Sequence, residues 1–122
     1  MTTITDAPQE FQKTTLPNGL RVVACEMPHT RSVSISIFIG VGSRYENDQE
    51  AGLSHFLEHL LFKGTEKRPD PVQISGTIES TGGVLNAGTE QELTVYWCKV
   101  AQPHFEESLD LLVDMLRNSL FE

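Results

Sequence analysis

Two histidines and a glutamate stand at a spacing that favours a metal site. His55 and His59 are four residues apart, so on a helix their imidazoles lie one turn apart and about 40° apart around the axis, within reach of one ion. Glu58 falls on the same side and places a carboxylate beside that ion. Imidazole nitrogens suit zinc, and a neighbouring carboxylate is the group with which a hydrolase deprotonates a water molecule on the metal. The spacing therefore predicts a hydrolytic metal centre.

The segment that carries these residues, 51–62, has the pattern of an amphipathic helix. With about 100° between residues, four large apolar side chains fall on one arc and form the expected core face: Leu53, Phe56, Leu57 and Leu60. The opposite arc holds the motif beside the small residues Ala51 and Gly52, and it carries no Lys or Arg. We expect the helix to begin with Asp48 as its N-cap and to end before Gly64.

A purely structural role is the simplest alternative for the motif. A surface histidine is usually only solvated, and His55 with Glu58, three residues on, can form an ordinary hydrogen-bonded pair. Two histidines and a glutamate at these offsets arise by chance in on the order of one in a hundred chains of this length or fewer. The metal interpretation is therefore favoured, and the His-x-x-Glu-His order is the inverzincin pattern.

Composition and charge limit the class of protein and its partners. The 122 residues suffice for one domain, and 39% hydrophobic with 21% charged residues is typical of soluble globular domains. The net charge of -8 would repel phosphate backbones, which argues against nucleic acid as a partner.

No apolar run approaches the roughly 20 residues that cross a bilayer, and the N-terminus lacks the pattern of a secretory signal. We expect a cytoplasmic protein with no membrane span, in which Cys25 and Cys98 are small buried hydrophobes without a disulfide.

Alternating apolar residues predict four strands. Residues 20–25 and 32–39 read as a hairpin, with His29 exposed in its turn. Residues 84–88 and 92–100 read as two further strands. The last of these carries apolar side chains on both faces, which indicates a sheet covered on both sides.

Two more helices complete the expected fold. One begins at Asp70, with Asp70 as N-cap, Pro71 in the first turn and Gln73 reaching back, and it should end near Thr81. The other spans residues 103–120, with an apolar stripe opposite a row of acids. We therefore predict an α+β fold in which helices pack on an antiparallel sheet.

Three runs of residues together resemble one protein family. They are Gly-Ser-Arg-Tyr-Glu at 42–46, the metal segment with its flanks at 52–65, and Gly-Gly-Val-Leu-Asn-Ala at 82–87. They are similar to the N-terminal domain of the pitrilysin/insulinase family of zinc metallopeptidases, especially its mitochondrial processing peptidase-like bacterial members. The resemblance implies an N-terminal tail at residues 1–14 and a partial metallopeptidase domain of this type at residues 15–122.

The resemblance also implies a role for each motif residue. His55 and His59 would be ligands of a single zinc ion, and Glu58 would be the general base for the zinc-activated water that hydrolyses a peptide bond. Asn86 and Ala87 match the edge strand on which family members lay the substrate peptide as an added strand. Taken alone, these last two residues read as ordinary strand and turn.

The chain departs from the family at the third zinc ligand. Family members use a downstream glutamate, which at the same spacing falls at roughly position 136, beyond residue 122. Nothing in the spacing of Glu79, Glu90 or Glu92 favours them as substitutes. Because two histidines alone bind zinc weakly, we expect this fragment by itself to be a poor or inactive peptidase. Gly88 stands where many relatives have an aromatic residue, which changes the expected contacts to the substrate side chain.

We therefore predict that the parent protein is a zinc endopeptidase acting on a peptide or a small protein. Full family members enclose a chamber between two halves, so pairing with a second family half is expected. As part of a larger domain the chain should also expose apolar surface, so homo-oligomerisation is expected as well. The alternative is a non-catalytic scaffold or inactive-partner subunit of the same family. Such relatives usually lose a motif residue, whereas this chain keeps all three. A metal-binding module without hydrolytic activity is a further alternative.

Overall fold

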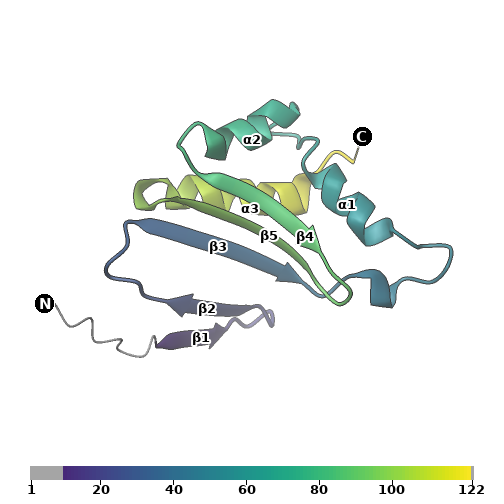
Figure 1. Cartoon of the computed structure of the whole chain (residues 1–122), viewed down its shortest axis with the longest axis horizontal. Helices are drawn as coiled ribbons and strands as arrows, with labels where there is room; N and C mark the ends of the chain where they lie inside the picture. Colours follow the sequence, from purple (N-terminus) through teal and green to yellow (C-terminus); the bar gives the residue numbers. More distant parts are fainter. Residues whose placement is uncertain (1–9, 122) are drawn as a thin grey trace, which may run out of the picture. The chain divides into compact units, whose positions relative to one another are not determined.

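The computed structural model describes residues 10–121 and divides the chain into two compact units, Met1–Arg31 and Ser32–Glu122 (Figure 1). Most of the tail expected at residues 1–14 lies outside the described residues. No helix in the described part of the chain is long and apolar enough to cross a membrane.

The first unit contains one two-stranded antiparallel hairpin. Strand β1 (Phe11–Thr15) pairs with β2 (Arg21–Cys25). Gly19, with φ +89°, supplies the left-handed conformation that the turn requires, and Asn18 Oδ1 accepts a 3.0 Å hydrogen bond from the Leu20 N–H. Strand β1 thus includes the last residues of the segment expected as a tail, Phe11 to Thr14.

The second unit is built on a three-stranded antiparallel sheet. Its strands are β3 (Ser32–Ile39), β5 (Thr94–Ala101) and β4 (Val84–Thr89), in the order β3-β5-β4. The hairpin expected between residues 20–25 and 32–39 is wrong, because β2 pairs with β1 and β3 pairs with β5. Alternation identified these strands correctly, but it carries no information about which strand pairs with which. Within this sheet β4 is an edge strand.

Helices cover one face of this sheet (Figure 1). They are α1 (Leu53–Leu61), α2 (Pro71–Glu79) and α3 (Phe105–Asn118). Short 3-10 turns lie at Ser43–Tyr45 and Gln102–His104. The core between sheet and helices consists of apolar side chains: Leu61, Ile74, Ile78, Tyr96, Cys98, Val100, Leu111, Leu112 and Met115. On the other face of β5, Val95 and Trp97 are only half-buried. The α+β prediction is confirmed, whereas helices cover the sheet of this unit on one face only.

The start of α2 follows the sequence prediction. Asp70 accepts a hydrogen bond from the Val72 N–H at 2.8 Å, and its own N–H donates to Gln73 Oε1 at 3.0 Å. Pro71 occupies the first turn, where its missing N–H has no intrahelical partner to lose. This capping box fixes where the helix begins.

The metal helix, α1 (Leu53–Leu61), packs with a different side from the one expected. Three residues of the expected core face are exposed: Leu53 by 43%, Phe56 by 59% and Leu57 by 37%. The buried residues are instead Glu58 and Leu61. The helix is amphipathic as predicted, but it contacts β4 with Glu58, which bonds to Thr89 of that strand. Glu58 therefore faces inward.

A buried ion-pair network ties the loop after α1 to α3. Asp114, only 6% exposed, accepts hydrogen bonds from Thr65 Oγ1 and Arg68 Nη1, both at 2.7 Å, and from Asn118 Nδ2 at 3.0 Å. Burial by itself raises the pKa of Asp114, but these three hydrogen bonds outweigh burial and hold the pKa below its usual value. The network fixes the chain where it leaves the metal helix.

Replacing Asp114 with alanine should lower the free energy of unfolding by about 3 kcal/mol, because Arg68 and Thr65 lose a buried partner. Urea denaturation at about pH 7 measures the loss. The folded-state pKa of Asp114 lies below its unfolded value of about 3.9. Its contribution is therefore fully present above that pH and is lost as the pH falls through the folded pKa, so the two proteins should converge in stability in acid.

Asp110 provides the matched control, because its carboxylate also pairs with Arg68 but is largely exposed. Asp110→Ala should cost much less stability than Asp114→Ala. Equal losses in the two variants would show that burial of the Asp114 network is unimportant.

Candidate metal and catalytic site

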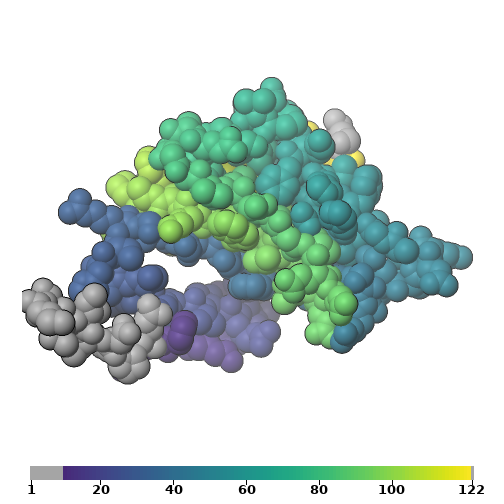
Figure 2. All heavy atoms as spheres, viewed as in Figure 1, coloured from purple at the N-terminus to yellow at the C-terminus, as the bar shows by residue number. Residues whose placement is uncertain are grey.

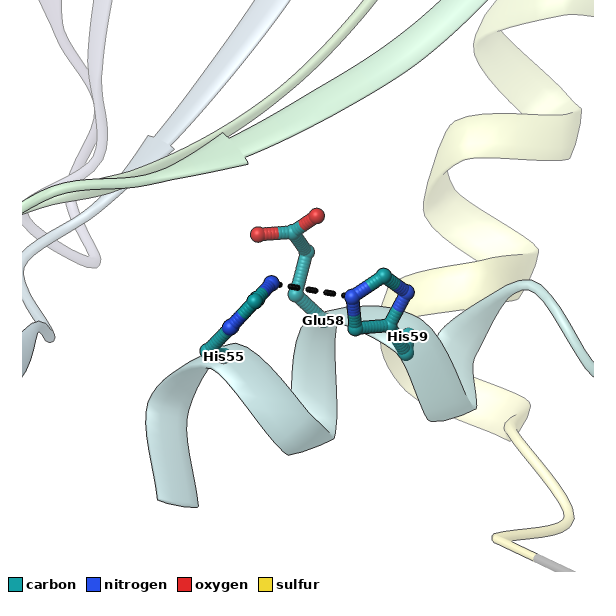
Figure 3. Close-up of side chains that lie close together, drawn as sticks. All are labelled: His55, Glu58 and His59. Carbon is teal, nitrogen blue, oxygen red and sulfur yellow. Dashed lines mark hydrogen bonds between the residues drawn. The ribbon is translucent and has the colours of Figure 1, made fainter. Parts of the chain in front are cut away.

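The structure brings the three motif side chains together on one side of α1 (Figure 3). The Nε2 atoms of His55 and His59 are 2.9 Å apart, and the ring centroids are separated by 4.6 Å. One ligand atom from each histidine and one oxygen of Glu58 lie within 4.8 Å of one another. Both histidines are exposed, whereas Glu58 is 8% exposed. A solvent-accessible pair of imidazoles therefore stands beside a buried carboxylate.

The two histidines fit a zinc ion. With zinc–nitrogen bonds of about 2.0–2.1 Å, tetrahedral geometry separates two ligand nitrogens by about 3.3 Å. The observed 2.9 Å needs only a small rotation of two exposed rings. Among the residues that the structure describes, no other His, Cys, Asp or Glu joins the cluster, so Glu79, Glu90 and Glu92 do not complete it.

A cleft of about 450 Å³ opens beside the cluster. Its walls come from α1, from the end of β4 and from the segment that precedes α1, with lining residues Ser43, Glu46, Gly52, His55, Glu58, Ala87, Gly88, Thr89, Glu90 and Gln91. Of the two residues expected to hold substrate, Ala87 lines the cleft, whereas Asn86 is exposed outside the lining. Gly88 leaves its part of the cleft open, since an added Cβ would meet only Val95 Cγ1, at 4.0 Å.

The carboxylate of Glu46 caps the N-terminus of α1. Its two oxygens accept hydrogen bonds from the Gly52 and Ser54 N–H groups, both at 2.9 Å. The bond from Ser54 first, and then that from Gly52, lower the pKa of Glu46. The N-cap residue is Gly52, at φ +86°. Because glycine has no side chain that could accept these hydrogen bonds, the carboxylate of Glu46 caps the helix instead. The expectation that Asp48 is the N-cap is therefore wrong.

The segment that carries Glu46 is held against the turn between β4 and β5 (Figure 2). The Ser43 N–H donates to the Glu90 carbonyl at 3.3 Å, and the Arg44 N–H donates to the Gln91 carbonyl at 2.8 Å. Only glycine fits at position 42, because an added Cβ would lie 2.4 Å from the Glu90 carbonyl oxygen. The Gly-Ser-Arg-Tyr-Glu run thus connects the strand turn to the start of the metal helix.

Glu58 has a partner that the sequence analysis did not identify. Thr89 Oγ1 donates a hydrogen bond to Glu58 Oε2. The β4–β5 register pairs Thr89 with Thr94 and Ala87 with Tyr96, so these side chains share the face of the sheet that α1 contacts. Burial first, and the nearby charge of Glu58 second, raise the pKa of Tyr96 to about 12. Alternation along β4 puts Thr89 on the same face as Ala87, and this was the one sequence signal that could have indicated Thr89 as a neighbour of Glu58.

The edge strand β4 has a backbone donor that the sheet does not use. The Ala87 N–H donates at 2.8 Å to the side chain of the preceding residue, Asn86 Oδ1, and so is not bonded to β5. A backbone donor at the edge of a sheet that is bonded only to a neighbouring side chain, beside the cleft, is available for strand addition.

Known proteins resemble this chain in sequence and in structure. Residues 21–122 match the family model described as Insulinase (Peptidase family M16). The chain is 45% identical over 113 residues to mitochondrial-processing peptidase subunit beta of Dictyostelium discoideum, covering 93% of this chain and 24% of that protein. It is 42% identical to a protein of Rickettsia felis named as an uncharacterized zinc protease, covering 93% of this chain and 27% of the relative. A crystal structure of a protease from Helicobacter pylori superposes with a TM-score of 0.84 at 31% identity, covering 91% of this chain and 26% of the other. The chain thus spans about a quarter of the length of each of these relatives.

Replacing Glu46 with alanine should weaken the metal helix, because the first turn of α1 loses both of its capping bonds. We expect the melting temperature to fall by about 5 °C. The folded-state pKa of Glu46 is lowered, so this stabilisation is present above about pH 4.3 and is lost as the pH falls through the folded pKa.

Asp48→Ala is the matched control, since Asp48 is the acid that sequence alone favours as the cap. It should leave the melting temperature unchanged. A larger effect from Asp48→Ala than from Glu46→Ala would contradict the observed capping.

Proposed function

We propose that the protein containing this chain, which belongs to the insulinase family (peptidase family M16), is a zinc-dependent endopeptidase. His55 and His59 would be two ligands of one zinc ion, and Glu58 would be the general base. The observation that carries the proposal is the convergence of two exposed imidazoles and one buried carboxylate on a single point beside an open cleft.

The third protein ligand is expected from residues beyond position 122. A catalytic zinc site takes three protein ligands and leaves one position open. The described residues offer only the two histidines beside the carboxylate that serves as the base. We therefore expect weak zinc binding and little or no peptidase activity from this segment alone, and the activity of the whole protein is the proposal.

The chemistry follows from the positions of these groups. A bound zinc ion would polarise the carbonyl of the scissile peptide bond and lower the pKa of a water molecule beside it. Glu58 then takes a proton from the attacking water and delivers it to the leaving amine, so that one residue serves as base and then as acid. Because Glu58 is buried beside the cleft, its carboxylate is shielded from bulk solvent on the side away from the substrate.

The substrate would bind as an additional strand along β4. The Ala87 N–H would exchange its bond to the Asn86 side chain for one to a carbonyl of the peptide, and the released Asn86 amide would bind the peptide backbone. A peptide paired with β4 in this way would pass the motif residues, because Gly88 and Thr89, the next residues of β4, line the same cleft as His55 and Glu58. Peptides and small proteins with an extended segment are the corresponding substrates.

A non-catalytic scaffold or inactive-partner subunit is the second candidate. It draws support from the relative whose name marks it as a subunit, mitochondrial-processing peptidase subunit beta. The same name supports pairing of this protein with a second family half. The intact motif favours the enzyme, since a scaffold needs neither the histidine pair nor the buried base.

The decisive experiment uses the complete protein that contains this chain. The unaltered protein should bind one zinc ion and cleave an extended peptide. Glu58→Gln should keep the zinc and lose about 10³-fold in kcat, since the general base is removed. His55→Ala should lose zinc and activity together. Metal analysis and cleavage of a fluorogenic peptide measure the two properties.

His104→Ala is the matched control, because His104 lies in the 3-10 turn before α3 and outside the metal cluster. It should retain both zinc and cleavage. Zinc binding without cleavage in the unaltered protein would favour a metal-binding module, and absence of both would favour a scaffold.

Ala87→Pro tests the proposed substrate strand. Proline removes the edge N–H without removing a hydrogen bond to β5, because that N–H is donated to Asn86. KM should rise about 10-fold, the value of one hydrogen bond, if chemistry is slow relative to substrate release. Ala87→Ser retains the N–H and is the control. An unchanged KM in a folded Ala87→Pro variant would exclude pairing of substrate with this donor.

A further inference from the structure

The hydroxyl of Thr89 is bonded to the carboxylate of Glu58. Its Oγ1 donates to Glu58 Oε2, across 31 positions of chain and from a different element, since Thr89 ends β4 and Glu58 lies on α1. Both residues line the cleft. We propose that Thr89 is a positioning residue for the general base: it holds one carboxylate oxygen of Glu58 so that the other is aimed at the attacking water. This inference rests on the proposed peptidase function.

The second carboxylate oxygen, Oε1, is the one left for chemistry. No donor among the described residues bonds to Oε1, and that part of the chain contains no buried side-chain oxygen without a partner. Oε1 therefore reaches the solvent of the cleft that Glu58 lines. Of the two carboxylate oxygens of Glu58, Oε2 is thus bonded to the strand and Oε1 is open to the cleft.

Thr89 is itself held firmly. It forms the last pair of the β4–β5 ladder, opposite Thr94, and the turn that follows is closed by a 2.8 Å hydrogen bond from the Glu90 N–H to the Leu93 carbonyl. A β-branched side chain in a strand has few χ1 rotamers, so its hydroxyl position is set by the backbone. A glutamate has three rotatable bonds and without a partner would sample several orientations. The strand therefore limits the motion of the base.

If the Thr89 hydroxyl only satisfied a buried charge, its removal would have a different effect from the removal of a positioning group. Removing it would leave Glu58 without a donor and lower stability, with no specific effect on turnover. A positioning residue affects the step in which the proton moves and so changes kcat with little change in KM. The two roles are distinguished by kinetics and by the response to the conservative substitution.

The test compares Thr89→Val with Thr89→Ser in the complete, zinc-loaded protein. Valine keeps the shape of threonine but removes the donor, so kcat should fall about 10- to 100-fold, as for other residues that orient a catalytic group. Serine keeps the donor and should retain most of the activity. KM should change by less than about twofold in both variants. Zinc content, measured by metal analysis, should remain at the level of the unaltered protein, because Thr89 bonds to neither histidine.

Thr94→Val provides the matched structural control. Thr94 is the cross-strand neighbour of Thr89, but its hydroxyl donates to the Val41 carbonyl at 3.1 Å and not to Glu58. It should lower the melting temperature without lowering kcat in the folded protein. If Thr89→Val does not fold, Thr89→Ala is compared with Thr89→Ser in its place.

Three results would overturn the inference while leaving the peptidase function in place. The first is a folded, zinc-loaded Thr89→Val variant whose kcat lies within about twofold of the unaltered protein. The second is a Thr89→Ser variant with a kcat as low as that of Thr89→Val. The third is a Thr94→Val variant with a kcat as low as that of Thr89→Val. An unaltered protein that neither binds zinc nor cleaves peptide would overturn the proposed function and this inference together.

Discussion

The contact between α1 and β4 through the carboxylate of Glu58 is the interaction on which the site depends. A charged group that is 8% exposed is costly to bury unless it is hydrogen-bonded. Thr89 supplies that bond from the strand, and the charge is close enough to influence the pKa of Tyr96 on the same face. Glu58 therefore faces the sheet, and three residues of the apolar arc, Leu53, Phe56 and Leu57, remain exposed. The geometry of the candidate site and the packing of the helix share one contact.

Both ends of the metal helix are fixed by polar contacts with distant parts of the chain. At the N-terminus, Glu46 caps the first turn, and the segment that carries it is bonded to the β4–β5 turn. After the C-terminus, Thr65 and Arg68 bind the buried carboxylate of Asp114 on α3. A short helix of nine residues has little stability of its own. These contacts hold the two imidazoles in position, which sites of this kind require.

The same arrangement links the proposed chemistry to the proposed binding of substrate. The strand that ends with Thr89 also carries the Ala87 N–H, which the sheet does not use, so the proposed base and the peptide would be positioned by one element. Gly88 lines the cleft without a side chain, and an added Cβ there would meet only Val95 Cγ1, so this position leaves space for a side chain of the peptide. A peptide bonded along β4 would thus be held at a fixed distance from the general base.

The sequence by itself determined the features that depend on local geometry. The spacing of His55, Glu58 and His59 sets their common direction on a helix, and the Asp70 capping box sets the start of α2. Alternation marks strands β2 to β5 but did not predict β1. Tertiary structure decided everything that depends on a partner far along the chain. It decided that β2 pairs with β1, that Glu46 and not Asp48 caps the metal helix, and that Glu58 and not the apolar arc is buried. Periodicity identifies the faces of an element but does not identify what each face will contact. A hydrogen bond such as that between Thr89 and Glu58 exists only once the two elements have packed.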